Sequence, residues 1–124
     1  MIKLSEAEWK VISALWEEAP QTIMQLTHYL YDATGWTKHT VMTFLRRMEE
    51  KGAVHYEEGP KAKLYYPDIR REDAVLQETE DFLEKVFQGK FGLMLNTMVE
   101  QKALSGEEIA ELYEILQKAE EGTK

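Results

Sequence analysis

The sequence of 124 residues contains no cysteine, which excludes disulfide bonds, thiol catalysis and thiolate metal sites. It also has no apolar run near the roughly 20 residues that a membrane-spanning helix needs. Its first six residues, Met1 to Glu6, form no apolar signal segment. We therefore expect a globular cytoplasmic protein without membrane insertion, built on one modest core or two small ones.

The arrangements of side chains that usually carry catalysis are missing as well. The histidines, at positions 28, 39 and 55, lie in three different predicted elements and lack the spacing of metal ligands. No nucleophile is paired with a base, and no glycine-rich phosphate loop is present. The carboxylates recur at helical intervals, which predicts that they lie on solvent faces. We expect neither an enzyme nor a bound metal or other cofactor.

Basic charge is scarce, because the net charge is −8, and this at first argues against a nucleic-acid partner. Its distribution changes that view. Residues 1–72 carry ten Lys or Arg and eleven Asp or Glu, whereas residues 73–124 carry five and twelve. Two segments of the first part, 36–47 and 59–67, contain no acidic residue at all. Their basic residues are Lys38, Arg46, Arg47, Lys61 and Lys63.

Residues 1–70 have the pattern of three short helices followed by a hairpin. Capping boxes at Ser5–Glu8 and Thr22–Gln25 open the first two helices. Thr37 caps the third helix, and Gly52 ends it. Short β-prone runs on either side of a turn at 58–60 predict strands at 53–57 and 64–67. The expected buried stripes are Trp9, Ile12, Leu15 and Trp16; Ile23, Leu26, Leu30 and Ala33; and Val41, Phe44, Leu45 and Met48. This order of elements is typical of a winged helix-turn-helix.

Residues 71–124 predict three amphipathic helices, with a further capping box at Ser105–Glu108. So short a helical unit can barely form a core alone, so we expect its apolar faces to be buried against a second copy. The predicted fold is mainly α with a small β-hairpin: an N-terminal winged helix-turn-helix (1–70) followed by a three-helix C-terminal dimerisation domain (71–124). The expected dimerisation residues are Val75, Phe82, Leu83, Val86, Phe87, Leu95, Met98, Ile109, Leu112 and Leu116.

The outer face of the third helix, opposite its buried stripe, has the chemistry of a DNA-reading surface. Arg pairs with guanine in the major groove, and Thr offers a hydroxyl or a methyl group to a base. The free N–H groups of the helix N-terminus suit a phosphate. The candidate DNA-binding residues are Thr37, Lys38, His39, Thr40, Met42, Thr43, Arg46 and Arg47 on this helix. Lys61 and Lys63 join them as wing residues that alternate to one side of their strand.

Each of these residues alone also fits an ordinary solvated surface, and only their combination favours DNA. Two other functions stay open. The slightly negative first part, with Glu49-Glu50 and Glu57-Glu58, fits a winged helix used as a protein-interaction module. The other function is that of a repressor that a small ligand releases from DNA by binding to residues 71–124.

Several stretches resemble the penicillinase repressor family, which includes the BlaI, MecI and CopY repressors. They are Leu4-Ser5-Glu6-Ala7-Glu8-Trp9, the run from Gly35 to Met48, Lys51-Gly52, Tyr65-Tyr66-Pro67, and the tail from Leu104 to Leu112. The resemblance implies a homodimer on a double-stranded palindromic operator and a transcriptional repressor, such as one controlling a β-lactamase or resistance-type operon. It places His39, Thr40, Thr43 and Arg47 among the contacts of the recognition helix, with Met42 and Arg46 at variable positions that tune the operator sequence.

Two departures from the family pattern bear on induction. The copper-responsive branch carries cysteines in its tail, so their absence here argues against thiolate copper sensing. In the β-lactam branch a membrane sensor-protease system leads indirectly to cleavage between asparagine and phenylalanine. The corresponding place here is Asn96-Thr97, which keeps the asparagine and lacks the aromatic residue. The inducing signal is therefore left open.

Overall fold

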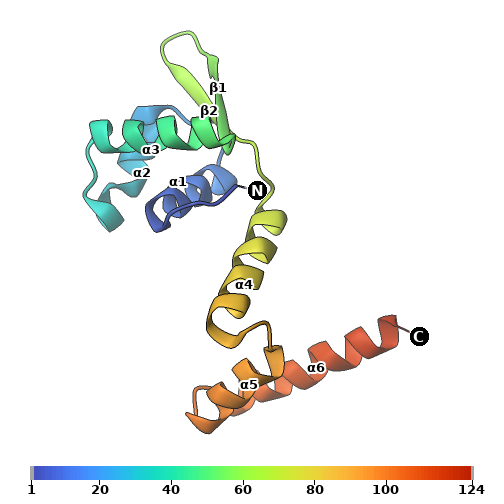
Figure 1. Cartoon of the computed structure of the whole chain (residues 1–124). Helices are drawn as coiled ribbons and strands as arrows, with labels where there is room; N and C mark the ends of the chain where they lie inside the picture. Colours follow the sequence, from blue (N-terminus) through green and yellow to red (C-terminus); the bar gives the residue numbers. More distant parts are fainter. Residues whose placement is uncertain (1, 124) are drawn as a thin grey trace. The chain divides into compact units, whose positions relative to one another are not determined.

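The computed structural model describes residues 2–123, which form six helices and one antiparallel hairpin (Figure 1). The chain divides into two compact units, the first ending at Val75 and the second beginning at Leu76. We call the first the head and the second the tail. The elements of the head are α1 (Glu6–Glu17), α2 (Ile23–Thr34), α3 (Lys38–Lys51), β1 (Val54–Glu58) and β2 (Lys63–Pro67), with the start of α4. Helix α4 (Arg71–Phe87) continues into the tail, which also contains α5 (Phe91–Glu100) and α6 (Gly106–Gly122).

The predicted helix boundaries follow from local signals that the structure contains. Ser5, Thr22 and Ser105 each accept a hydrogen bond from the backbone three residues on, and in each box the Glu or Gln at that position accepts one in return. Glycines at positive φ end α2 at Gly35 and α3 at Gly52, a conformation that glycine adopts without a steric penalty.

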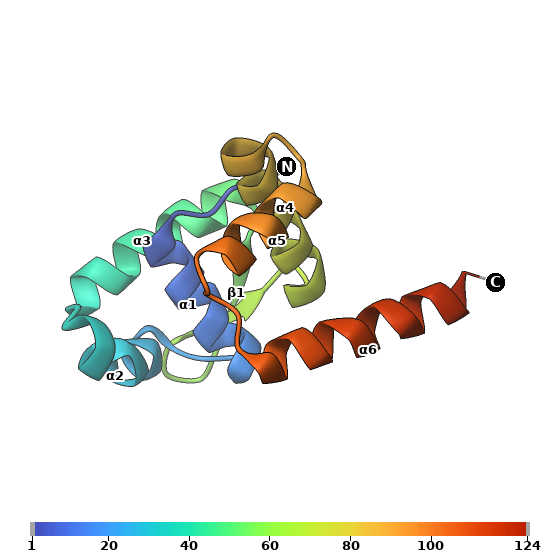
Figure 2. The ribbon, with the colours of Figure 1, turned by 90° about the horizontal axis from the view of Figure 1, so that it is seen from below.

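Helices α1, α2 and α3 enclose the core of the head together with the hairpin (Figure 2). The buried apolar residues are Val11, Ile12, Ala14, Leu15, Leu26, Leu30, Val41, Leu45, Met48, Ala53, Val54 and Tyr65. The predicted stripe on α3 is confirmed, with Phe44 half-buried against Trp36. The prediction for Ala33 was wrong: its side chain is exposed, because α2 ends at Thr34 and its last turn lies beyond the packed face.

The expectation that the carboxylates lie on solvent faces was wrong for Glu8. This residue is 2% exposed. Its carboxylate Oε1 accepts hydrogen bonds from the Ser5 backbone and the Lys51 ammonium group. A buried carboxylate is tolerated when it is paired and hydrogen-bonded, and the partner here comes from 43 residues along the chain.

The hairpin packs on the helices of the head through Val54 and Tyr65, and β2 also forms a bridge to the segment before α2. In its register His55 lies opposite Tyr66, and Tyr56 lies opposite Tyr65. Gln21 exchanges two backbone hydrogen bonds with Tyr65. The Gln21 side chain donates to the carbonyl oxygens of Ala14 and Glu18 at the end of α1. Through Gln21, these contacts fix the position of β2 relative to the end of α1. We call the hairpin, residues 54–67, the wing.

The helices of the tail are amphipathic, yet none of them has a buried residue among those that the structure describes. Phe82 is 50% exposed, Ile115 52% and Leu116 57%. Exposed apolar side chains on this scale are unusual for a folded monomer. The tail therefore has amphipathic helices without an interior of its own. Among the described residues, no helix is long and apolar enough to cross a membrane.

Candidate nucleic-acid interface

The outer face of α3 is the side of the helix opposite its buried residues, and its side chains lie toward solvent. Thr37 caps the helix by accepting from the backbone N–H of Thr40, at 3.3 Å. Val41, Leu45 and Met48 are buried, so at 100° per residue His39, Thr43 and Arg46 lie on the opposite side. His39 and Arg46 are exposed, and Thr43 is half-exposed. The helix thus presents one continuous outward face over about two turns.

Three cationic side chains lie on or beside this face of α3. Among residues 2–123, Lys38, Arg46 and Arg47 make no hydrogen bond or ion pair through their side chains. Arg46 does act on the wing, because its charge opposes the rise in the pKa of Tyr65 that burial causes. The Arg46 side chain is exposed, so its guanidinium is available to an acceptor.

The threonine hydroxyls of α3 are partly committed to the helix itself. Thr43 donates its hydroxyl proton to the carbonyl of His39, at 3.0 Å. The hydroxyls of Thr37 and Thr40 lie 3.2 Å apart and share a hydrogen bond. A hydroxyl carries one proton and two lone pairs, so Thr43 retains acceptor capacity and its methyl group. Contact with a thymine methyl suits that arrangement better than donation to a base.

The two lysines of the wing differ in their surroundings. Lys61 lies in the turn at the tip of the hairpin and not in a strand, so the prediction that it alternates with Lys63 along one strand was wrong. Its side chain has no hydrogen-bond or ion-pair partner among residues 2–123. Lys63 begins β2, and its ammonium nitrogen lies 4.1 Å from the centre of the Tyr56 ring. Cation–π contacts of this kind restrain a lysine.

Tyr56 is a residue of the wing that sequence reasoning missed. The hairpin pattern could have indicated its contact with Lys63. Tyr56 pairs with Tyr65 across the two strands, and Lys63, two residues before Tyr65, is then the diagonal neighbour of Tyr56. Using it required the strand register, which depends on the length of the turn. Tyr56 therefore restrains one of the two wing lysines, Lys63.

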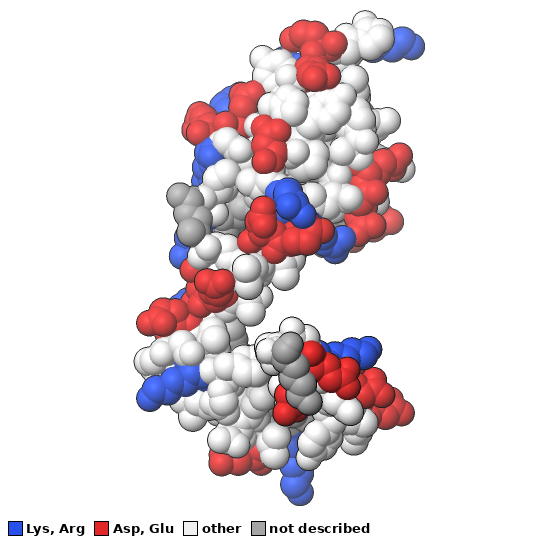
Figure 3. All heavy atoms as spheres, turned by 90° about the vertical axis from the view of Figure 1, so that its right-hand side faces the viewer, with Lys and Arg blue, Asp and Glu red and all other residues white. Residues whose placement is uncertain are grey.

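Charge is spread unevenly over the surface. On the side of the molecule drawn in Figure 3, acidic side chains cover more of both units than basic ones do. This agrees with the net charge of −8. Long-range attraction of the whole chain to a polyanion is therefore weak, and binding to DNA depends on the local basic groups of α3 and the wing.

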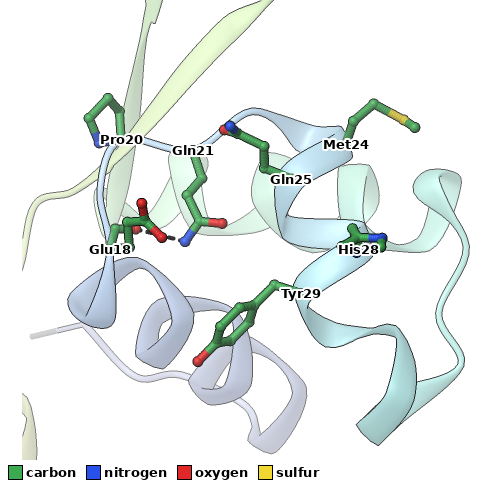
Figure 4. A pocket seen from close by; sticks show the side chains of 7 residues that line it. All are labelled: Glu18, Pro20, Gln21, Met24, Gln25, His28 and Tyr29. Atoms are coloured by element: carbon green, nitrogen blue, oxygen red, sulfur yellow. Dashed lines mark hydrogen bonds between the residues drawn. The ribbon is translucent and has the colours of Figure 1, made fainter.

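Hollows of the head lie along α2, and none of the residues predicted to bind DNA is among those that line them. One of about 390 Å³ is open to solvent and lined by Glu18, Pro20, Gln21, Met24, Gln25, His28 and Tyr29 (Figure 4). The Gln21 amide in it is already bonded to backbone carbonyls. Within residues 2–123 no cluster of three His, Asp or Glu side chains is arranged to hold a metal ion.

The Asn96-Thr97 bond lies in the middle of α5, and both residues are exposed. Thr97 donates its hydroxyl to the carbonyl of Leu93 one turn earlier, at 2.8 Å. Cleavage of a peptide bond inside a folded element proceeds through local opening. Helix α5 has no buried residue among those described, so within one protomer little packing opposes such an opening.

Comparison with known proteins assigns this architecture to a family. The model of the family described as penicillinase repressor matches residues 4–118. The chain belongs to the penicillinase repressor family. It is 30% identical over 115 residues to the penicillinase repressor of Bacillus licheniformis, which covers 93% of this chain and 90% of the relative. The methicillin resistance regulatory protein MecI of Staphylococcus aureus is 28% identical over 116 residues, covering 94% of each chain.

Solved structures of penicillinase repressors agree with the fold of the head. The DNA-binding domain of the repressor BlaI matches 59% of this chain and 93% of its own, with 26% identity and a TM-score of 0.52. The monomeric form of B. licheniformis BlaI, solved in complex with the blaP half-operator, matches 57% of this chain and 87% of its own, with 25% identity and a TM-score of 0.51. The predicted N-terminal winged helix is thereby confirmed.

A second group of proteins matches the fold over nearly the whole chain, and not over the head alone. A mutant of MarR from E. coli matches 94% of this chain and 78% of its own, with a TM-score of 0.55 and 20% identity. At that identity the match concerns the fold alone. It extends the structural likeness beyond the head into the helices that follow it.

Proposed function

We propose that this penicillinase repressor family member is a dimeric transcriptional repressor that binds a palindromic operator of a β-lactamase or resistance-type operon. The observation that carries the proposal is the outer face of α3. That face contains the exposed His39, the half-exposed Thr43 and the exposed Arg46, whose side chain has no ion-pair partner among residues 2–123, on a head whose fold matches a DNA-binding domain. The names of the relatives, a penicillinase repressor and a methicillin resistance regulator, give the class of operon.

The contacts divide into base-reading and phosphate-binding groups. Arg46 and Thr43, on the outward face, are assigned to base edges, with His39 and Met42 beside them. Thr37, Lys38, Thr40 and Arg47, at the helix N-terminus and along its flank, are assigned to phosphates. Lys61 and Lys63 of the wing complete the phosphate group.

Dimerisation is supported by the tail and by the charge of the head. The tail exposes apolar side chains that a second copy would cover, including Phe82 and Leu116. Residues 1–72 carry ten basic and eleven acidic residues, so one head offers few phosphate contacts. Two heads joined in one dimer bind a two-fold symmetric operator with both half-sites contributing.

The assignment of roles is tested by two alanine variants on α3 and the wing. Arg46→Ala is expected to weaken operator binding by about 1–3 kcal/mol and to leave affinity for random DNA nearly unchanged, because a base contact is lost. Lys61→Ala is expected to weaken binding to every sequence and to flatten the salt dependence, because a phosphate contact is lost.

The measurement is fluorescence anisotropy titration on an operator selected from a random library and on a scrambled duplex, over a range of salt. The control is Glu18→Gln, at an exposed residue that follows the last turn of α1, and it should change neither affinity. Equal loss on both duplexes for Arg46→Ala and Lys61→Ala would contradict the division of roles. No binding of the wild-type chain to either duplex at low salt would refute DNA binding itself.

A further inference from the structure

The last residue of the recognition helix is a lysine whose side chain is bonded to other residues of the head. Lys51 ends α3, and a cation at this position would ordinarily be assigned to a phosphate. Its ammonium group instead forms an ion pair with Glu8 of α1 and donates to the carbonyl of Lys3, at 2.9 Å. Two acceptors within the head therefore hold the Lys51 side chain.

Glu8, on the other side of this contact, is buried and has little freedom to move. Its side chain is 2% exposed, against 38% for that of Lys51. Its Oε1 also accepts from the backbone of Ser5, and its Oε2 is buried without a hydrogen-bond partner among the described residues. A carboxylate in this setting depends on its cation, because removing one partner of a buried pair leaves an uncompensated charge.

We propose that the Glu8–Lys51 pair is a positioning pair for operator recognition, which fixes the angle of α3 by clamping its C-terminal end to the first turn of α1. The proposal rests on the proposed function of α3 as the recognition helix. In this proposal neither Glu8 nor Lys51 contacts DNA. Both act through the placement of His39, Thr43 and Arg46.

The length of α3 makes its angle matter. Its 14 residues give a helix of about 21 Å, so a tilt of about 3° at the C-terminal end moves the first turn by roughly 1 Å. Hydrogen bonds to base edges tolerate only a few tenths of an ångström. Phosphate contacts made by long, flexible lysine side chains tolerate more, so a loosened clamp reduces sequence discrimination before it reduces general affinity for DNA.

The experiment compares Lys51→Met, Glu8→Gln and the double variant with wild type in the full chain. For each, affinities for the selected operator and for a scrambled duplex are measured over a range of salt, at a temperature where tryptophan fluorescence reports a folded head. Glu17→Gln is the matched control, because it removes an exposed α1 ion pair, to Arg71, that does not involve α3.

Lys51→Met and the double variant are expected to lower the ratio of operator to scrambled affinity about tenfold, the equivalent of one lost base contact. The slope of affinity against salt should stay that of wild type, because no phosphate contact is removed. Glu17→Gln should keep the wild-type ratio. If Lys51→Met does not fold, the double variant decides, because it leaves no buried charge unpaired.

A folded double variant with the wild-type ratio would overturn the proposal and leave the pair with a role in stability alone. A reduced salt slope for Lys51→Met would also overturn it, because Lys51 would then be a phosphate ligand. Failure of the proposed function is distinct from both results, since wild type itself would then show no preference for any selected duplex.

Discussion

Glu8 illustrates how burial and pairing compete at one residue. Burial alone would raise the pKa of its carboxyl group, but hydrogen bonds from Lys51 and Ser5, together with the charge of Lys51, outweigh it, so the pKa is lowered. A carboxyl group with a lowered pKa in the folded state stabilises the fold above its unfolded pKa. That contribution is lost as the pH falls through the folded value.

This predicts that the head becomes less stable on acidification through Glu8. Between about pH 5 and pH 3 the free energy of unfolding should fall more steeply for wild type than for Glu8→Gln, which has no proton to bind. Urea unfolding followed by tryptophan fluorescence measures it, since Trp9, Trp16 and Trp36 all lie in the head. Parallel curves for the two proteins would mean that Glu8 does not contribute to acid sensitivity.

At the scale of one element, α3 depends on the residues that begin and end it. Gly52 ends the helix with φ of 83°, and a Cβ atom built there meets nothing within 4 Å. An alanine at this position would therefore have space, and its cost would be conformational. Left-handed backbone costs an L-residue about 1–2 kcal/mol.

We therefore expect Gly52→Ala to lower the free energy of unfolding of the head by about 1–2 kcal/mol without disturbing its packing. Denaturant titration gives the value, and an unchanged m-value would indicate that the folded and unfolded states keep their compactness. Gly92→Ala, in α5 and also without a close neighbour, is the control and should not change the transition reported by the tryptophans. A stabilised Gly52→Ala head would contradict the left-handed cap.

The elements differ in how far the sequence alone could predict them. Helix ends were predictable because capping boxes and glycine caps are local, acting over three or four residues. The burial of Glu8 was not predictable, because its partner Lys51 lies 43 residues away. Lys61 was misplaced because the length of the turn, and hence the register, is set by packing. On the candidate interface the outward face followed from periodicity, but the hydrogen bond that occupies the Thr43 hydroxyl required coordinates.

At the scale of the whole molecule, the sequence predicts amphipathic tail helices and a second copy as the surface that covers them, and in a single protomer these apolar faces are exposed. The proposed dimer supplies that surface. Phe82→Glu is expected to convert the dimer into monomers, because a charge cannot be buried in an apolar interface without a partner. Sedimentation equilibrium measures the association, and operator affinity should fall with it because the two heads no longer share one molecule.

The control for this experiment is Tyr31→Glu, which places a charge on an exposed aromatic residue of the head, 58% exposed, instead of the tail. It should leave the oligomeric state unchanged. Tryptophan emission should stay native in both variants. A Phe82→Glu chain that remained dimeric at micromolar concentration would place the interface elsewhere.

A tail without an interior also has a consequence for the lifetime of the protein in a cell. In the proposed dimer, a protomer without a partner displays a surface of the kind that chaperones and proteases recognise, and the population of open forms governs degradation. Unpaired copies would be removed while paired copies persist. Repression would then respond steeply to the rate of synthesis, since halving that rate lowers the dimer by more than half. The apolar helices would in this way set a threshold of gene dosage below which the operator is left vacant.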